Sequence, residues 1–164
     1  MDLPLGTSLR AGLKTVESNM FQILVQMLSK GFTGYVVCTA EGPKGIEQGV
    51  LLFKKGAVLG SYFEFVSHAI EVNGDPSLRL VLNSFLAKNG IIDINALTIQ
   101  QIDLITAFQE KILITEEIDT KKLNRLYPKK YSEEFTLEYI KGESEETSRF
   151  EVFKEAGLLG VEEK

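Results

Sequence analysis

The sequence predicts an α+β fold in which helices pack on an antiparallel β-meander. Three segments rich in β-branched and aromatic residues follow one another at 34–40, 46–54 and 57–65, with only short turns between them. Consecutive strands joined by short turns pair in antiparallel fashion. A segment with the apolar spacing of a helix precedes them at 18–30, and the composition, 44% hydrophobic and 25% charged, is that of a protein with a packed core.

Charge and cysteine content exclude several classes of protein. The net charge of the 164 residues is −5, which argues against general nucleic-acid binding. One cysteine and one histidine exclude a disulfide framework, a multi-cysteine zinc site and any site that needs two imidazoles. We find neither a signal peptide nor an apolar stretch long enough to span a membrane, so we expect a cytoplasmic protein that does not use a membrane.

The chain before the meander predicts an extended segment and then a helix. The leucines of residues 1–17 fit neither the helical nor the strand period, so we expect an extended lead-in with one short strand. From Met20 onward, apolar residues recur on one face of a helix that covers about 18–30. Ser18 or Asn19 can cap this helix, because their side-chain oxygens accept from free N–H groups of the first turn.

The middle strand of the meander is expected at the centre of the sheet. Residues 50–53, Val-Leu-Leu-Phe, are apolar on both faces of a strand, which predicts a strand covered on both sides. Glycine-containing turns at 41–45 and 55–56 separate this strand from its neighbours. We therefore expect Phe53 to be buried in the core.

Shorter elements follow the meander. A helix that begins with Asp75 as its N-cap is expected next, and then a strand at 91–97. Thr98 and Gln101 have the spacing of a capping box, which predicts a helix that continues to about Leu113.

The composition changes after residue 114, which predicts the domain organisation. Residues 115–164 carry thirteen acidic and nine basic residues, and their apolar residues are thinly spread. We expect a core domain at 1–114 and a charged helical extension at 115–164 that packs on the core or stays partly flexible. Within the extension we expect a short helix at 120–126, a strand at 135–140 and a final helix at 144–156.

Few residues suggest chemistry. Glu64, His68 and Glu71 are close in sequence and would form a general base or half of a metal site if this stretch were helical. No further metal-ligand motif accompanies them, so a surface histidine among acids is the preferred interpretation. Cys38 lies in the middle of a strand, where cysteine is usually a small buried hydrophobe. We therefore expect no catalytic residue, metal or cofactor.

Residues 121–131 form a basic segment that also contains tyrosines. Such a segment could contact phosphates and stack on a base, but acidic residues on both sides favour a solvated surface. We expect it to make a secondary contact with a partner. The residues expected in this contact are Lys121, Lys122, Arg125, Tyr127, Lys129 and Lys130.

Three segments resemble the pattern of PATAN-type domains. They are the helix at 20–28, the strand that begins within 31–36 and the hairpin at 49–60. The chain is similar to an uncharacterised archaeal protein family that carries this core at its amino end. The resemblance covers residues 3–65 well and 75–113 loosely. It implies a non-enzymatic interaction or signalling module, and it carries over no functional residue because its motifs are glycine turns.

The sequence leaves three functions open. A non-enzymatic regulatory or adaptor module that binds a protein partner or a second copy of the chain is our first expectation. A roadblock- or longin-like regulator of a small GTPase or motor would show the same helix and meander. An enzyme or small-ligand binder would use Glu64, His68 and Glu71 in a deep polar pocket, whereas an apolar patch or a sheet edge would favour the first two functions.

Overall fold

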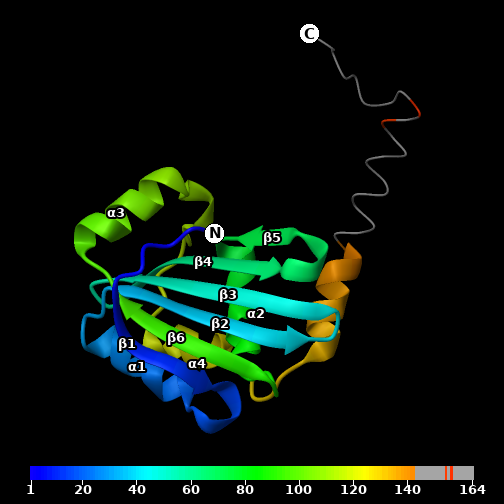
Figure 1. Cartoon of the computed structure of the whole chain (residues 1–164), viewed down its shortest axis with the longest axis horizontal. Coiled ribbons are helices and arrows are strands. Elements are labelled where there is room, and N and C mark those ends of the chain that lie inside the picture. The colour runs from blue at the N-terminus through cyan, green and yellow to red at the C-terminus, as the bar shows by residue number, and fades with distance from the viewer. Residues whose placement is uncertain (143–153, 155, 157–164) are drawn as a thin grey trace. The chain divides into compact units, whose positions relative to one another are not determined.

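The computed structural model describes residues 1–142, 154 and 156. These residues form a six-stranded antiparallel sheet with helices, so the predicted α+β class is confirmed (Figure 1). The strands are β1 (Thr7–Lys14), β2 (Gly34–Gly42), β3 (Gly45–Lys54), β4 (Ala57–Phe65), β5 (Ile70–Asn73) and β6 (Gly90–Ala96). The helices are α1 (Met20–Ser29), α2 (Asp75–Ser84), α3 (Ile99–Phe108) and α4 (Thr120–Leu126), with 3-10 turns η1 (Thr15–Glu17), η2 (Val66–His68) and η3 (Glu110–Ile112). The chain divides into two compact units, residues 1–131 and 132–164.

The predicted meander is confirmed as β2, β3 and β4. Val50 of β3 pairs with Val37 on one side and with Tyr62 on the other. The turn between β3 and β4 consists of Lys55 and Gly56, with φ angles of 50° and 78°. Two positive φ angles give the tight hairpin turn whose twist matches that of the flanking strands.

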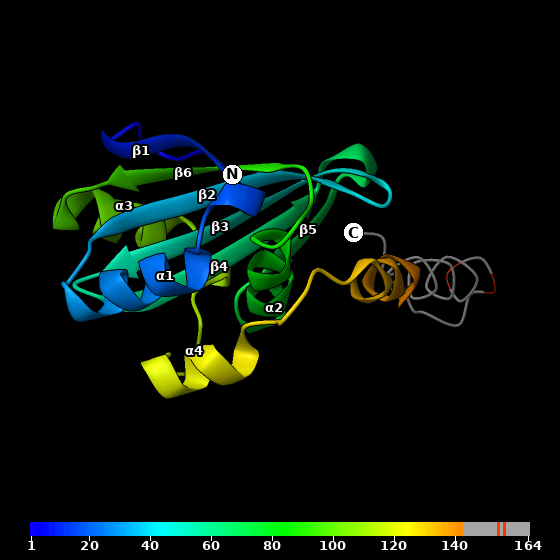
Figure 2. The same cartoon turned by 90° about the horizontal axis from the view of Figure 1, so that it is seen from below.

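Side chains cover both faces of β3, as its apolar run predicts. Phe53 faces α1 and α2, where it lies beside Leu24 and Leu82. Leu52 faces the opposite way and packs in a cluster with Ile102 of α3. Figure 2 shows α1 and α2 on one side of the sheet, with α4 beyond them. Phe53 is 0% exposed, which confirms its predicted burial.

The meander is extended on both sides by further strands. The order is β1-β6-β2-β3-β4-β5, so β6 pairs along β2 and β1 pairs with β6. Among the described strands, the sheet edges are therefore β1 and the four-residue β5. The short strand expected in the lead-in is confirmed as β1, and it forms one edge of the sheet.

Capping chemistry sets the helix boundaries. The predicted capping box is confirmed, because Thr98 Oγ1 accepts from the Gln101 N–H and Gln101 Oε1 accepts from the Thr98 N–H. The expectation that Asp75 is an N-cap is wrong. Gly74 is the N-cap, at a φ of 68° that glycine adopts readily. The Asp75 carboxylate instead accepts from the N–H and the hydroxyl of Thr115, at 3.0 and 2.8 Å.

The chain after α3 is tied to the first unit by short elements. α3 ends at Phe108, before the expected Leu113, and η3 follows it. The short helix expected at 120–126 is confirmed as α4, whose N-cap Asp119 accepts from the Lys122 N–H at 2.7 Å. The expected domain boundary after residue 114 stays a prediction. Within the described part of the chain, no helix has the length and apolar character that a bilayer span requires.

The second unit begins with a helix. Residues 133–142 are helical, so the strand expected at 135–140 is wrong. Ser132 Oγ accepts from the Phe135 N–H at 3.2 Å, and two glutamates follow Ser132 in sequence. A serine N-cap followed by acidic residues stabilises the start of a helix, and this local signal outweighs the alternation of apolar residues. The helix expected at 144–156 lies, except for two residues, outside the described part of the chain.

Candidate interaction surface

The acidic residues expected around His68 are only partly brought together. Glu64 of β4 and Glu71 of β5 lie directly opposite each other. Their carboxylate oxygens lie 3.0 and 3.1 Å from the hydroxyl of Tyr62. A phenol carries a single proton, so it can donate to only one of the two carboxylates at a time. Burial of the ring, and then the two carboxylates, raise the pKa of Tyr62.

His68 does not join this pair. It lies in η2 and is exposed. A cavity of about 650 Å³ lies beside Tyr62 and Glu71, and neither His68 nor Glu64 lines it. Over the described residues, no three His, Cys, Asp or Glu side chains are placed to hold a metal ion. The geometry therefore does not assemble the three residues into one constellation.

Cys38 is a packing residue of the sheet. It lies on β2, is 0% exposed, and its Sγ is 3.5 Å from the carbonyl oxygen of Ser84 in α2. Burial raises the pKa of its thiol to about 12. A thiol with such a pKa is a poor nucleophile, which agrees with the structural role expected from its strand position.

The basic segment divides into inward and outward residues. Lys122 forms an ion pair with Glu116. The Tyr127 ring packs edge-on against Phe21 of α1 at 5.4 Å between centroids, and burial raises its pKa to about 12. These two residues are therefore used within the fold. The exposed bases of this segment that have no ion-pair partner among the described residues are Lys121, Arg125, Lys129 and Lys130.

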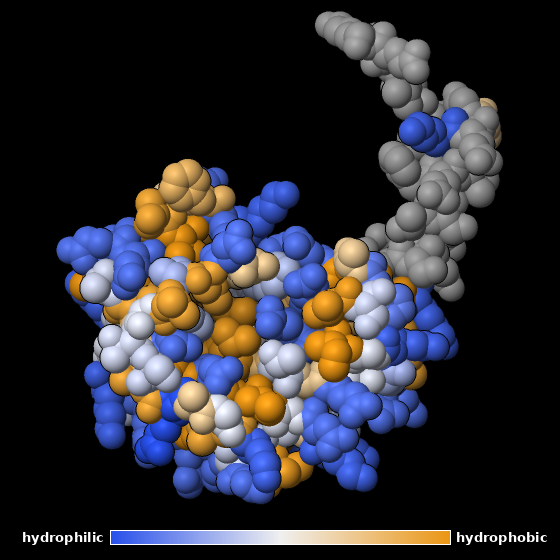
Figure 3. All heavy atoms as spheres, in the orientation of Figure 1, coloured by the Kyte–Doolittle hydropathy of each residue, from blue (hydrophilic) through white to orange (hydrophobic). Residues whose placement is uncertain are grey.

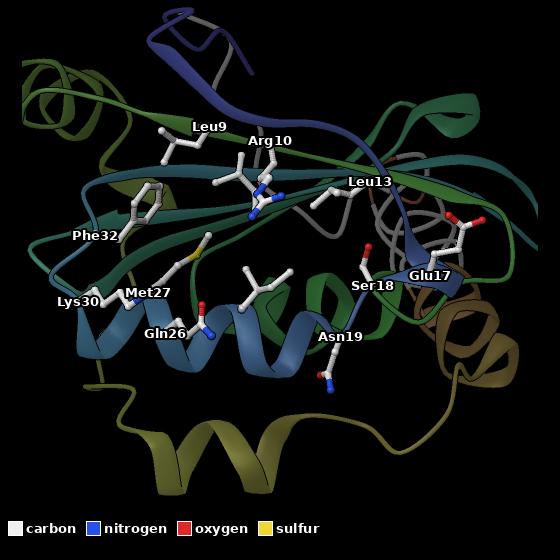
Figure 4. Close-up of a pocket in the computed structure, with 12 residues that line it drawn as sticks. Leu9, Arg10, Leu13, Glu17, Ser18, Asn19, Gln26, Met27, Lys30 and Phe32 are labelled. Atoms are coloured by element: carbon white, nitrogen blue, oxygen red, sulfur yellow. The ribbon is translucent and has the colours of Figure 1, made fainter.

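A groove between β1 and α1 is a feature that the sequence did not indicate. Its cavity volume is about 500 Å³. Leu9 and Leu13 of β1 form one wall, and α1 forms the other. The apolar residues that line this β1–α1 groove are Leu9, Leu13, Ile23, Met27, Phe32 and Ile94 (Figure 4). Leu9 is 52% exposed, so an apolar side chain of the groove stays open to solvent.

Irregular pairing of β1 builds this groove. The register between β1 and β6 shifts between Ser8 and Arg10 and again between Arg10 and Leu13. In a regular strand, Leu9 and Arg10 would point to opposite faces, whereas here both line the groove. Irregularities of this kind re-aim side chains at sheet edges. Gly12 within β1, Gly6 just before it and leucines that fit neither period were the signal of this irregularity in the sequence.

The rim of the β1–α1 groove is positively charged. Lys14 is paired with Glu17 at 3.1 Å. Lys14 itself does not line the groove, whereas Arg10 and Lys30 do, and neither of these two has an ion-pair partner among the described residues. Figure 4 shows Arg10 pointing from β1 into the space above α1. An apolar groove with unpaired cations therefore lies on a chain whose net charge is −5.

A second apolar surface lies on α3. Leu104 and Phe108 are spaced by one helical turn and are 59% and 81% exposed. Figure 3 shows apolar side chains gathered over this helix. Phe108 also lines the cavity beside Tyr62, whereas neither residue lines the β1–α1 groove. The α3 surface is therefore separate from the β1–α1 groove.

Comparison with known proteins identifies a family. Residues 1–109 match a family described as an uncharacterized protein conserved in archaea (DUF2226). No curated protein and no solved structure matches the chain. The matched residues include all six strands and α1 to α3, and therefore both walls of the β1–α1 groove, whereas α4 lies beyond the match.

Proposed function

We propose that this chain, which belongs to the archaeal DUF2226 family, is a non-enzymatic interaction module that docks a partner protein in the β1–α1 groove. The observation that carries the proposal is the apolar groove itself, with Leu9 left 52% exposed on an edge strand. A concave apolar surface with a polar rim is the usual form of a docking site, because a partner removes its apolar area from water.

The resemblance to PATAN-type domains forms part of this proposal. It covers residues 3–65, which contain β1, α1 and the strands β2 to β4, and it implies an interaction or signalling module. We place the activity in the cytoplasm. The proposed docking function assigns no role to Glu64 and Glu71, whose carboxylates lie against the hydroxyl of Tyr62.

The outward bases of α4 supply a secondary contact. Lys121 and Arg125 are one helical turn apart, and Lys129 and Lys130 follow the helix. Exposed charges at the rim of an interface steer the encounter with an oppositely charged partner and contribute little to the affinity of the docked state. We assign these four bases the role of steering the partner during its encounter with the protein, while the groove holds the docked partner.

Site-specific photo-crosslinking tests the proposed function. Benzoylphenylalanine replaces Leu9 in one protein and Val66, which is 46% exposed in η2, in a matched control. In the cells that produce the protein, the probe at position 9 should capture a discrete protein and the probe at position 66 should not. Excess unlabelled wild-type protein should suppress the adduct, and excess Leu13→Asp protein should not. Identical adducts from both positions, or none from position 9, would contradict the proposal.

A further inference from the structure

Building on the proposed function, we infer that the occupant of the β1–α1 groove is an amphipathic helix of a partner protein, with carboxylates flanking its apolar stripe. Three features of the groove carry this inference. They are the arrangement of its apolar walls, the irregular edge of β1 and the unpaired cations at its rim.

The walls of the groove suit a helix. Ile23 and Met27 are one helical turn apart on α1 and form a ridge along one wall. A second helix that packs beside α1 would place its side chains against this ridge, at the usual interaxial distance of about 8–10 Å. Leu9 and Leu13 would contact the other side of the occupant. Since α1 has ten residues, the matching length is roughly 15 Å, or about three turns.

The free edge of β1 is poorly suited to a strand. Two register shifts interrupt its pairing, and Gly6 and Gly12 have positive φ angles of 59° and 68°. The Gly12 N–H donates to Asp93 Oδ1 at 2.8 Å, so this donor is not available to a new strand. A strand that extends a sheet needs a regular row of free donors and acceptors, and irregularities of this kind protect edges from such pairing.

The charges of the rim select an acidic helix. Arg10 stands on one wall and Lys30 follows the last turn of α1, and neither is paired within the described part of the chain. The only acidic residue lining the groove, Glu17, is already paired with Lys14. Guanidinium groups bind carboxylates through two parallel hydrogen bonds, so Arg10 favours Asp or Glu beside the apolar stripe.

A second copy of the chain is a weaker candidate. Its α3 exposes Leu104 and Phe108, but the carboxylate of Asp103 on that helix is already paired with Lys54 at 2.5 Å. Insertion of α3 into the groove of another copy would also join two different surfaces, and such contacts form open chains unless the rotation closes. Self-association is therefore an outcome to be distinguished by experiment.

Peptide selection tests the inference. The full chain is immobilised and used to select from a phage library of random peptides of about 14 residues, long enough for three helical turns. Peptides that also bind the Leu9→Asp protein are discarded. The remaining peptides should show apolar residues at helical spacing and an excess of Asp and Glu. The double variant Arg10→Glu/Lys30→Glu should select Lys and Arg instead, and should bind the wild-type peptides at least about tenfold more weakly.

Each other outcome has a defined meaning. Peptides with apolar residues at alternate positions would indicate that the groove binds a strand. Peptides without an excess of acidic residues would show that Arg10 and Lys30 do not select carboxylates. Either result overturns the inference and leaves the proposed function standing. A dimer in sedimentation that Leu9→Asp dissociates would overturn it in favour of a second copy. If every selected peptide also binds the Leu9→Asp protein, the inference is overturned. The proposed function is then contradicted only if the probe at position 9 also captures no protein. Circular dichroism of both variants confirms that these exposed substitutions leave the fold intact.

Discussion

The backbone N–H of Gly12 donates a hydrogen bond to the carboxylate of Asp93, 2.8 Å away, and thereby fixes the irregular part of β1 to β6. Gly12 lies between Arg10 and Leu13, where the register of β1 shifts. This contact therefore holds one wall of the β1–α1 groove in place.

Asp93→Ala should loosen this wall. Loss of the acceptor should cost about 1 kcal/mol of unfolding free energy, the usual net value of one hydrogen bond. Hydrogen exchange of the β1 amides should accelerate while that of β3 stays unchanged. Asp93→Asn is the matched control, because it retains the side-chain oxygen. Equal exchange of β1 in the wild-type and Asp93→Ala proteins would show that the contact does not hold the strand.

Phe53→Ala should be strongly destabilising. Phe53 is 0% exposed, and its ring packs edge-on against Phe32 at 5.6 Å between centroids. Truncation of a buried aromatic residue costs about 3–5 kcal/mol of unfolding free energy, measurable in urea melts. Phe108 is 81% exposed, so Phe108→Ala should change the unfolding free energy by less than about 0.5 kcal/mol. A small effect at Phe53 would mean that the core between the sheet and α1 is not packed as described.

Glu47 should make stability depend on pH. Its carboxyl is 2% exposed and has no hydrogen-bond partner within the described part of the chain, and burial raises its pKa from 4.5 to about 7. The folded state therefore holds a proton that the unfolded state releases above its ordinary pKa. The stability that the protonated carboxyl contributes is fully present below the pKa that Glu47 has in the unfolded state. It is lost as pH rises through the pKa that Glu47 has in the folded state.

Glu47→Gln isolates this effect, because the other titrating groups cancel between the two proteins. Near pH 4 the two should have similar unfolding free energies. Near pH 9 the variant should be more stable by up to about 3 kcal/mol, the equivalent of the pKa shift. A difference that does not change with pH would show that Glu47 is hydrated in solution.

Charge reversal on α4 should change the rate of partner binding more than its strength. Lys121→Glu with Arg125→Glu should lower the association rate constant about tenfold at low salt and leave the dissociation rate constant within about twofold. Lys44→Glu with Lys88→Glu, two exposed bases outside α4, changes the net charge equally and serves as the control. Both rate constants are measured by surface plasmon resonance with the partner that photo-crosslinking identifies. Equal effects of the two double variants would show that α4 takes no part in the interface.

Local signals made much of the fold predictable. The capping box of Thr98 and Gln101, the turn at Lys55 and Gly56 and the two-sided apolar run that contains Phe53 each depend on neighbours in sequence, and all three are confirmed. The predictions were wrong where a local sequence pattern is compatible with two local structures. Asp75 looked like an N-cap, but Gly74 can adopt a backbone conformation that leaves the carboxylate free to bind Thr115.

The candidate site was less predictable because it depends on non-local pairing. The β1–α1 groove exists because β1 pairs with β6, which follows it by more than 70 residues. Alternation predicts that Leu9 and Arg10 point to opposite faces, and only the register shifts bring both to the groove. Conversely, Glu64 and His68 are close in sequence, yet a strand and a turn place them in different surroundings.

Backbone amide shifts on binding test the central claim most directly. The isotope-labelled protein is titrated with the acidic helical peptide obtained by selection, and its amide resonances are followed by NMR. We predict shifts that are confined to β1, α1 and two further residues that line the groove, Phe32 and Ile94. Shifts centred on Leu104 and Phe108 of α3, or on Tyr62 and Glu71, would contradict docking in the β1–α1 groove.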